Sequence, residues 1–327
     1  MIPFKFSIAK NQSEALGLIH QHQHAAFLAG GTNILDLMKE HVAQPTEIID
    51  LGRLPLSTIK STNTGISLGA LAKNTETANH PLIRKDYPVL SKAILAGASA
   101  QIRNMASNGG NLMQRTRCSY FYDINMPCNK RVPGSGCAAM KGFNRMHAIF
   151  GWSDQCVAVY PSDMAIALSA LNANVKVMQQ NGSERSIPFT DFHVLPKDHP
   201  EKDNSLNHGE LITSIELPKN NFASHSSYIK VRDRNSYAFA LVSVAAGFEL
   251  EGNTIKTAHI AMGGVAHKPW RALKAEAFLK DKAATFANFI KAADLEMSSA
   301  KPLSHNKFKI EMGKQTLIHA FEVALKG

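Results

Sequence analysis

Short apolar runs alternate with helical patterns over the first part of the chain. A serine followed by apolar residues at helical spacing marks a helix start, and a short, wholly apolar run indicates a buried strand. These rules predict a strand at residues 4–6, a helix from Ser13 through Ile19, a strand at 27–29, a helix at 34–38 and a strand at 48–49. The alternation of strands and helices indicates a small α/β lobe over residues 1–55.

A second, larger α+β lobe is expected over residues 56–220. Its predicted elements are short strands around Ile59 and at 66–68, apolar helices between 71 and 98, a helix at 164–171 and a strand at 175–178. A long segment at residues 115–157 separates these two groups of elements and has neither the helical nor the strand period. The segment is therefore expected to be irregular.

The last third of the chain predicts a separate domain over residues 221–327. The strands expected there cover residues 228–231, 239–250 and 255–262. The Gly252-Asn253 pair between the last two is typical of a tight turn, so the sheet is expected to be antiparallel. Helical patterns follow from Arg271 to the end. Together the regions predict an α+β protein with domains at 1–220 and 221–327.

Composition narrows the class of protein. The chain of 327 residues is 44% hydrophobic and 19% charged, which is ordinary for a globular protein with a sizeable core. No apolar run approaches the roughly 18 residues that span a bilayer, and residues 1–9 lack the apolar core of a secretory signal. The formal net charge is +10, but lysine and arginine form no dense run and no nucleic-acid-binding motif. A solvated surface or an acidic protein partner is the favoured interpretation.

The four cysteines are the strongest chemical signal. Cys118, Cys128, Cys137 and Cys156 are the only ones in the chain, and they follow the spacing C-x9-C-x8-C-x18-C. Four soft thiolates that converge on one point can ligate an iron–sulfur cluster or a tetrahedral zinc ion. No two of them are two to four residues apart, which disfavours a zinc ribbon. An iron–sulfur cluster is the favoured hypothesis; structural zinc, disulfides and unligated thiols are the alternatives.

The residues around the cysteines suit an anionic cluster. Between Arg115 and Arg145 the cations are Arg115, Arg117, Lys130, Arg131, Lys141 and Arg145, against the single acid Asp123. Cationic side chains and backbone N–H groups offset the charge of a cluster, although a basic run also fits a solvated surface. His147 is another potential metal ligand in the segment, but the four cysteines already complete a set.

Two stretches pair adjacent glycines with hydroxyl and amide side chains. Ala29-Gly30-Gly31-Thr32-Asn33 lies at a predicted strand-to-helix junction, and Ser107-Asn108-Gly109-Gly110-Asn111 repeats its chemistry. Glycines allow a backbone to approach a pyrophosphate closely, and N–H groups at a helix start favour anions. Neither stretch is the G-x-G-x-x-G of a Rossmann domain. A diphosphate held between two loops is one interpretation, and two ordinary tight turns are the other.

These stretches resemble those of a known family. The chain is similar to the FAD-binding subunits of molybdenum hydroxylases, which are the medium subunits of the xanthine dehydrogenase and carbon monoxide dehydrogenase family. The cysteine segment resembles that of one branch, the flavoprotein subunits of bacterial periplasmic aldehyde oxidoreductases. The likeness covers nearly the whole chain and is carried by residues 27–35, 101–112, 115–122, 127–137, 161–164, 230–242 and 263–270.

The resemblance implies a fold and two cofactors. Residues 1–220 would form a two-part FAD-binding domain of the vanillyl-alcohol-oxidase and CO-dehydrogenase flavoprotein type, followed by the C-terminal domain of the family. The implied FAD contacts are Ala26, Phe27, Leu28, Ala29, Gly30, Gly31, Thr32, Asn33, Ile34, Ser107, Gly109, Gly110, Asn111, Asp163 and Lys230. The two glycine stretches would hold the pyrophosphate, and Asp163 and Lys230 would lie at the polar tail or the ring. The implied ligands of a [4Fe-4S] cluster are Cys118, Cys128, Cys137 and Cys156.

Two of these residues have a second interpretation, and a neighbouring residue, Asn108, departs from the family pattern. Asp163 follows Pro161-Ser162 and also fits a plain helix start, and Lys230 also fits an exposed strand residue. Asn108 stands where the family commonly has a small or apolar residue. This departure concerns the fine geometry of FAD binding.

The resemblance also implies an oxidoreductase subunit that does not act on substrate alone. A large molybdenum-cofactor subunit would oxidise an aldehyde to a carboxylic acid, and a small [2Fe-2S] subunit would pass the electrons to FAD here and on to an external acceptor. No catalytic residue is expected in this chain of the heterotrimer. A subunit like that of 4-hydroxybenzoyl-CoA reductase or xanthine dehydrogenase is one alternative, and a zinc-stabilised basic scaffold without redox function is another. The implied location is the periplasm, reached on a signal of the small subunit, with the cytoplasm as the alternative.

Overall fold

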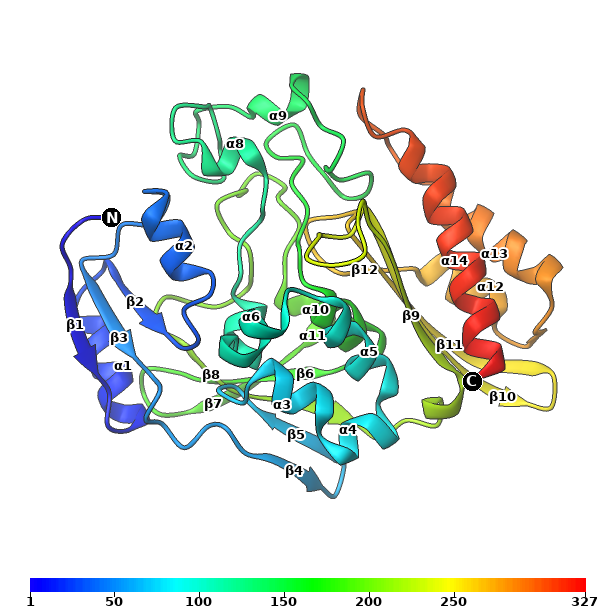
Figure 1. The fold of residues 1–327 in the computed structure, drawn as a ribbon, viewed down its shortest axis with the longest axis horizontal. Coiled ribbons are helices and arrows are strands. Elements are labelled where there is room, and N and C mark those ends of the chain that lie inside the picture. The colour runs from blue at the N-terminus through cyan, green and yellow to red at the C-terminus, as the bar shows by residue number, and fades with distance from the viewer.

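The computed structural model describes residues 1–327 and contains three sheets. The sheets follow one another along the long axis of the molecule, with the N-terminal lobe at one end and the C-terminal domain at the other (Figure 1). Each sheet has its own buried apolar cluster. The cofactor-sized cavities described below lie where these three units meet.

The N-terminal lobe is a three-stranded parallel sheet in the order β1-β3-β2. Its elements are β1 (Lys5–Ile8), α1 (Gln12–Gln21), β2 (Ala25–Leu28), α2 (Ile34–Lys39) and β3 (Glu47–Asp50). Helix α1 begins before the predicted Ser13, because the side chain of Asn11 caps it by accepting the N–H of Glu14. Buried Leu16 and Ile19 of this helix pack against the sheet.

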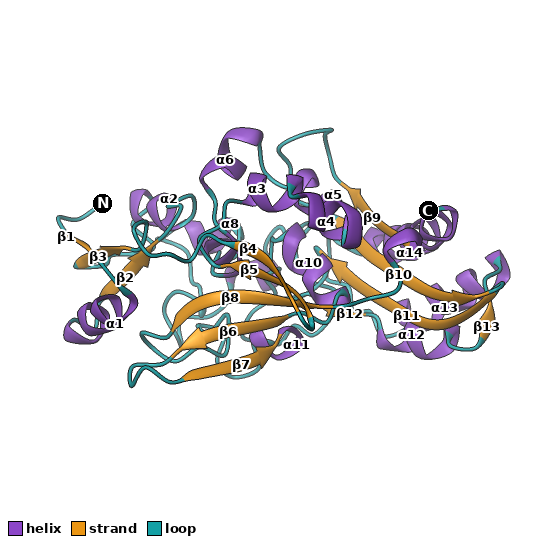
Figure 2. Ribbon diagram, turned by 90° about the horizontal axis from the view of Figure 1, so that it is seen from below, coloured by secondary structure: helices purple, strands orange, loops and turns teal.

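The middle lobe is a five-stranded antiparallel sheet in the order β4-β5-β8-β6-β7. Its strands are β4 (Ile59–Thr62), β5 (Gly65–Gly69), β6 (Asn174–Met178), β7 (Glu184–Pro188) and β8 (Leu211–Pro218). Its helices are α3 (Asn74–Asn79), α4 (Pro81–Asp86), α5 (Pro88–Ala96), α6 (Ala100–Met105), α7 (Asn108–Leu112), α10 (Asp163–Ala170) and α11 (Phe189–Phe192). Helices α3 to α6 lie on one side of this sheet (Figure 2). The sequence missed β7 because this edge strand buries only Ile187.

The C-terminal domain confirms the predicted antiparallel sheet followed by helices. Its strands are β9 (Ser226–Val231), β10 (Val242–Glu251), β11 (Thr254–Gly263), β12 (Trp270–Arg271) and β13 (Lys282–Ala283), after a short 3-10 turn η1 (Ala223–His225). Its helices are α12 (Leu273–Leu279), α13 (Phe286–Met297) and α14 (Phe308–Lys326). The rings of Phe248, Phe289 and Phe321 contact one another at centroid separations of 5.5 to 5.9 Å and join the sheet to the helices.

The cysteine segment, residues 115–157, stands above the middle sheet as a long irregular loop (Figure 1). It contains two single-turn helices, α8 (Ser119–Tyr122) and α9 (Ala138–Lys141). Asp203 anchors it from the middle lobe, because one carboxylate oxygen lies 2.7 Å from Lys130 Nζ and the other 2.6 Å from Arg115 Nε. Arg115 and Lys130, two of the cations that we expected to offset the charge of a cluster, are therefore paired with Asp203, which lies more than 70 residues away in the sequence.

A buried lysine ties the same segment to the C-terminal domain. Lys309, in the first turn of α14, is fully buried and donates hydrogen bonds to the backbone carbonyls of Met146, His147 and Gly264 at 3.0, 3.0 and 2.7 Å. Burial lowers the pKa of Lys309 to about 7. The carbonyl of His147 also accepts from the side chain of Asn306. The carbonyls of Met146 and Gly264 accept hydrogen bonds from Lys309 alone, so without this lysine they would be unpaired.

Replacing Lys309 with methionine is expected to destabilise the protein by about 3 kcal/mol, because buried carbonyls lose their donor while the alkyl stem is kept. Urea unfolding followed by circular dichroism measures the change. Lys307→Met is the matched control, since Lys307 is an exposed lysine two residues earlier, and it is expected to change the free energy of unfolding by less than about 0.5 kcal/mol. Equal effects of the two substitutions contradict the anchoring role.

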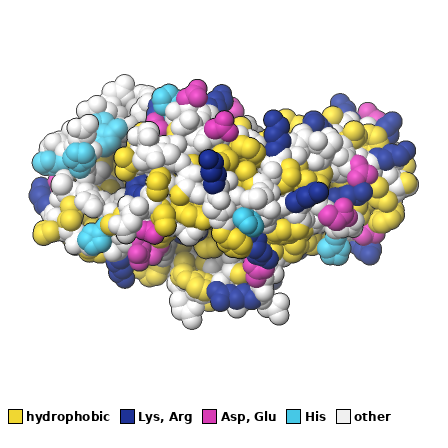
Figure 3. Space-filling model, turned by 90° about the horizontal axis from the view of Figure 1, so that it is seen from above, with side chains coloured by type: hydrophobic (Ala, Val, Ile, Leu, Met, Phe, Trp, Pro, Cys, Tyr) yellow, Lys and Arg dark blue, Asp and Glu magenta, His cyan; other side chains and the backbone are white.

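The structure has no membrane-spanning helix, and one face of its surface carries side chains of both charges (Figure 3). Every helix of the structure falls short of the length and apolar character that crossing a bilayer requires. Lysine and arginine side chains are interspersed with acidic and hydrophobic ones over the face drawn in Figure 3.

Candidate cofactor-binding site

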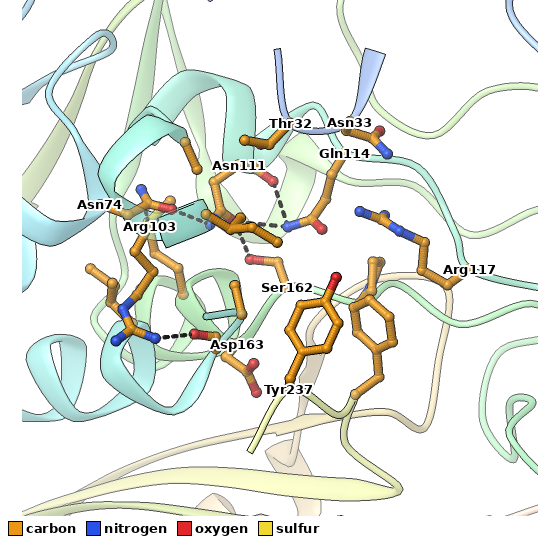
Figure 4. A pocket seen from close by; sticks show the side chains of 18 of the residues that line it. Thr32, Asn33, Asn74, Arg103, Asn111, Gln114, Arg117, Ser162, Asp163 and Tyr237 are labelled. Carbon is orange, nitrogen blue, oxygen red and sulfur yellow. Dashed lines mark hydrogen bonds between the residues drawn. The ribbon is translucent and has the colours of Figure 1, made fainter. Parts of the chain in front are cut away.

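Two cavities meet where the N-terminal lobe faces the middle lobe. The first has a volume of about 670 Å³ and is lined by residues of both lobes and of the C-terminal domain. The second, of about 440 Å³, lies beside β2 and the loop before β8. Thr32, Asn33 and Gly110 line both, so the cavities join at the two glycine stretches. Figure 4 shows the polar side chains that surround the first cavity.

Each glycine stretch approaches a neighbouring segment of the middle lobe closely. A Cβ on Gly30, just after β2, would lie 2.1 Å from the carbonyl oxygen of Met105 at the end of α6. A Cβ on Gly109 would lie 3.2 Å from the carbonyl oxygen and Cβ of Ala70. Only a residue without a side chain allows the first approach, because a backbone oxygen cannot be displaced cheaply. A Cβ on Gly110 would lie 4.0 Å from the Cβ of Ala29, and both stretches line the second cavity, so the structure brings together stretches that are about 80 residues apart in the sequence.

The second glycine stretch is a helix start, which corrects the prediction of a loop. Ser107 caps α7 by accepting the N–H of Gly110 at 3.2 Å. Asn108 points away from the cavities, is fully buried, and bonds to the side chain of Asn74 and the carbonyl of Gly69. Asn108 therefore anchors α7 to the middle lobe and leaves the cavity lining unaffected.

Asn33 presents an unpaired donor at the junction of the two cavities. Its Oδ1 accepts the N–H of Arg115 at 3.0 Å, which fixes the direction of the side chain. Its Nδ2 is buried and has no partner. Leaving a buried amide N–H unpaired costs about 1–3 kcal/mol, which an oxygen of a bound ligand would recover. The junction therefore suits a phosphate oxygen, which would accept the hydrogen bond that Asn33 Nδ2 lacks.

Asp163 and Lys230 form a buried ion pair in the wall of the first cavity. Lys230 Nζ lies 2.8 Å from Asp163 Oδ2, and the two side chains are only 4% and 8% exposed. Tyr228 donates its hydroxyl to the other carboxylate oxygen at 2.5 Å, and burial raises the pKa of this phenol. Asp163 also begins α10, so the helix-start interpretation holds as well. The alternative of an exposed Lys230 is wrong.

The structure gathers nearly all residues that the sequence assigned to FAD. Ala26, Phe27, Ala29, Gly30, Gly31, Thr32, Asn33, Ile34, Ser107, Gly109 and Gly110 line the second cavity, and Asn111, Asp163 and Lys230 line the first. Leu28 lines neither. Its side chain packs toward Gly31 within the N-terminal lobe.

Sequence reasoning missed several side chains of the first cavity. Arg103, Gln114, Arg117 and Tyr237 line it, and Figure 4 shows them around the same space as Asn111 and Asp163. Arg103 and Arg117 lie within stretches that carry the family resemblance, and this position is the sequence signal that could have identified them as cavity residues. Their direction depends on tertiary contacts, such as the guanidinium of Arg117 lying 5.4 Å from the ring centroid of Phe239.

The four cysteines line one small cavity in their segment. Cys118, Cys128, Cys137 and Cys156 all border a space of about 10 Å³, and all four are free thiols. Cys128 and Cys137 are paired across an antiparallel bridge, which folds the irregular loop back on itself. The structure has no group of three or more cysteine, histidine or acidic side chains arranged to hold a metal ion. A four-iron cluster is larger than this space, so its thiols must move apart to hold one.

The thiols differ in acidity. A hydrogen bond with Cys156 lowers the pKa of Cys137 below its usual value, whereas burial raises the pKa of Cys118 to about 11. His147 Nε2 lies 3.1 Å from Cys118 Sγ, and burial lowers the pKa of this histidine to about 4, so its ring is neutral at pH 7. Four cysteine sulfurs are nevertheless the ligand chemistry that a tetrahedral metal ion or an iron–sulfur cluster uses once the thiols lose their protons. The residue types therefore suit such a group, although the structure does not arrange them to hold one.

Two family models match consecutive parts of the chain. The first, described as the FAD binding domain in molybdopterin dehydrogenase, matches residues 2–220. The second, described as the CO dehydrogenase flavoprotein C-terminal domain, matches residues 227–323. Together they confirm the predicted fold: a two-part FAD-binding domain followed by a C-terminal domain with an antiparallel sheet and helices.

The chain is similar to curated and solved proteins over almost its full length. It is 47% identical to the aldehyde oxidoreductase FAD-binding subunit PaoB of Escherichia coli (strain K12), over 97% of this chain and 96% of that protein. It is 28% identical to the glyceraldehyde dehydrogenase medium chain of Sulfolobus acidocaldarius, over 84% of this chain and 81% of that one. The solved carbon monoxide dehydrogenase from Hydrogenophaga pseudoflava matches at a TM-score of 0.77 and 24% identity, covering 99% of this chain and 98% of that one, which shows a shared fold.

Proposed function

Because the chain belongs to the family of FAD-binding subunits of molybdenum hydroxylases, we propose that it serves as the electron-transferring subunit of an aldehyde oxidoreductase. The observation that carries this proposal is the 47% identity, over nearly the whole of both chains, to a subunit of that name. The second curated relative is also a subunit of an aldehyde-oxidising enzyme by its name. The proposed reaction converts an aldehyde to a carboxylic acid on a partner subunit.

The joined cavities supply the proposed seat of FAD. The pyrophosphate lies between the two glycine stretches, where Asn33 Nδ2 is an unpaired donor. The first cavity takes the flavin ring beside the Asp163–Lys230 pair, whose cation favours an anionic ring. Bound FAD accepts electrons singly and releases one or two, so it can link carriers of both kinds. The role of the protein is to orient the cofactor and to set its electrostatic surroundings.

The cysteine segment supplies the proposed seat of a [4Fe-4S] cluster. Its support is the convergence of all four cysteines of the chain on one cavity, together with the absence of carboxylates from that cavity's lining. Lys130 and Gln155 line the same space. Thiolates are the ligands that iron–sulfur clusters use, and nearby cations and N–H groups stabilise their negative charge. The cluster is proposed to contribute to electron transfer to the acceptor as well as to hold the loop.

The proposed assembly is a heterotrimer with a large molybdenum-cofactor subunit and a small [2Fe-2S] subunit. Its support is that similar chains are named as subunits or medium chains of larger enzymes. Electrons enter from the small subunit, pass through this chain and leave to an external acceptor. We also propose that the complex is periplasmic and is exported on a signal of the small subunit; the branch whose cysteine segment this chain resembles supports that location.

Coexpression of the chain with its two partner subunits tests the function. The purified complex is expected to be yellow-brown, to contain FAD, iron and acid-labile sulfide, and to oxidise aldehydes with ferricyanide. Cell fractionation measures its location. A complex that lacks FAD, contains zinc and holds only the iron of the small [2Fe-2S] subunit supports the zinc-stabilised scaffold. Activity only as a reductase of aromatic thioesters supports the 4-hydroxybenzoyl-CoA reductase alternative, and activity only on purines supports the xanthine dehydrogenase alternative.

A further inference from the structure

A third cavity lies between the proposed flavin cavity and the cysteine segment. It has a volume of about 330 Å³ and shares Arg117, Ser162, Asp163 and Phe239 with the first cavity. Its far wall includes Cys118 and its neighbour His147. The cavity therefore borders both proposed redox sites, and neither the family models nor the FAD assignment accounts for it.

The lining of this third cavity is largely apolar. Phe143, Met146, Val159, Ile166 and Phe239 contribute most of the hydrophobic wall. Phe143 and Phe239 are 64% and 45% exposed, so two aromatic residues of the lining reach the solvent. Exposed aromatic side chains beside an apolar hollow are typical of a site for a flat organic ligand.

The charges in this lining select against an ionic ligand. Arg117 is its only lysine or arginine, and Asp163 is its only carboxylate. Asp163 is already paired with Lys230 and Tyr228. The guanidinium of Arg117 donates one N–H to the carbonyl of Arg115 and keeps others for a neutral oxygen. A dinucleotide, with its two phosphates, finds too few cations here and exceeds the space.

We propose that this cavity binds an uncharged, single-ring electron acceptor of the quinone class. The proposal rests on the proposed function, which supplies the reductant. A quinone gains two electrons and two protons to become a hydroquinone: the reduced flavin gives up two electrons and one proton, and solvent gives the second proton. Arg117 holds one carbonyl oxygen, the rings of Phe143 and Phe239 contact the ligand, and the far end of the ligand approaches Cys118.

The test uses the intact purified complex and duroquinone, which is fully substituted and so resists addition of thiols. Val159→Phe fills the cavity, and Phe143→Ala removes one of the two exposed aromatic rings of its lining. Phe286→Ala is the matched control, since Phe286 is also exposed, at 56%, and lines none of the three cavities. Duroquinone binding to the oxidised complex is measured by calorimetry. Aldehyde oxidation is assayed with duroquinone and, separately, with ferricyanide.

Each variant in the cavity is expected to raise both the Kd and the KM for duroquinone by about tenfold or more. Ferricyanide turnover and the flavin absorbance are expected to stay within about twofold, and Phe286→Ala is expected to match the wild type on every measure. Because Phe143 is a surface residue, its variant keeps the test decisive if Val159→Phe does not fold. Unchanged duroquinone binding in Phe143→Ala, or competition by NAD⁺ for the same site, overturns the proposal. A wild-type complex without flavin overturns the proposed function instead.

Discussion

Replacing Cys128 with serine is expected to lower the iron and the acid-labile sulfide of the purified complex by about four atoms each, because a serine hydroxyl is a poor ligand for iron and only the iron of the proposed small [2Fe-2S] subunit remains. Cys128 is buried and pairs with Cys137 across the bridge that closes the loop. Loss of the cluster is expected to loosen the segment and to slow transfer of electrons to the acceptor. Colorimetric iron and sulfide assays and electron paramagnetic resonance of the reduced complex measure the loss.

Met126→Ser is the control for this substitution, since it places a serine on an exposed position of the same loop. It is expected to leave the iron content unchanged. Full iron content in Cys128→Ser contradicts the proposed cluster ligands. A variant that lacks the iron of the proposed [4Fe-4S] cluster but keeps FAD and normal acceptor turnover contradicts only the electron-transfer role of that cluster, and leaves it a structural one.

Replacing Gly30 with alanine is expected to weaken FAD binding by about 100-fold, equal to about 3 kcal/mol. The added Cβ would lie 2.1 Å from the carbonyl oxygen of Met105, so the two lobes must separate at the junction of the two cavities. The change should move Asn33 away from the second glycine stretch. Equilibrium dialysis of released FAD and the flavin absorbance of the purified complex measure the effect.

Gly17→Ala is the matched control, because Gly17 lies inside helix α1 and a Cβ added there would have nothing within 4 Å. It is expected to stabilise the protein by about 0.5–1 kcal/mol and to leave FAD content unchanged. Retention of FAD by Gly30→Ala, in a protein that unfolds at the wild-type urea concentration, contradicts the close approach of the two lobes at this residue.

The two sites share a structural connection through Arg115. Its backbone N–H bonds to Asn33 at the FAD junction, and its side chain shares Asp203 with Lys130 of the cysteine segment. Removal of the cluster is therefore expected to weaken FAD binding modestly, whereas Gly30→Ala is expected to leave the iron content intact. This asymmetry follows because Lys130 and Arg115 keep Asp203 paired when only the FAD junction opens.

Local patterns predicted much of the secondary structure, but the central strand β8 was not predicted, although its burial largely alternates. Apolar runs located β2, β5, β6, β9, β10 and β11, because these strands are rich in apolar residues that are buried or half-buried. The polar edge strand β7 and the two-residue strands β12 and β13 carry no such pattern. Helix α7 was predicted as a loop because its glycines disfavour a helix, whereas the cap by Ser107 and the buried Asn108 hold it in place.

The sequence by itself determined the kinds of residue available to the sites: four cysteines in one segment, two glycine pairs beside hydroxyl and amide side chains, and the stretches that carry the family resemblance. Those signals are local, so they are readable along the chain. Only the tertiary structure decided that Asp203 neutralises Lys130, that Lys230 is buried against Asp163, and that a third cavity separates the proposed redox sites. These features depend on contacts between residues far apart in the sequence, whose directions are set by the packing of three sheets and cannot be read from spacing.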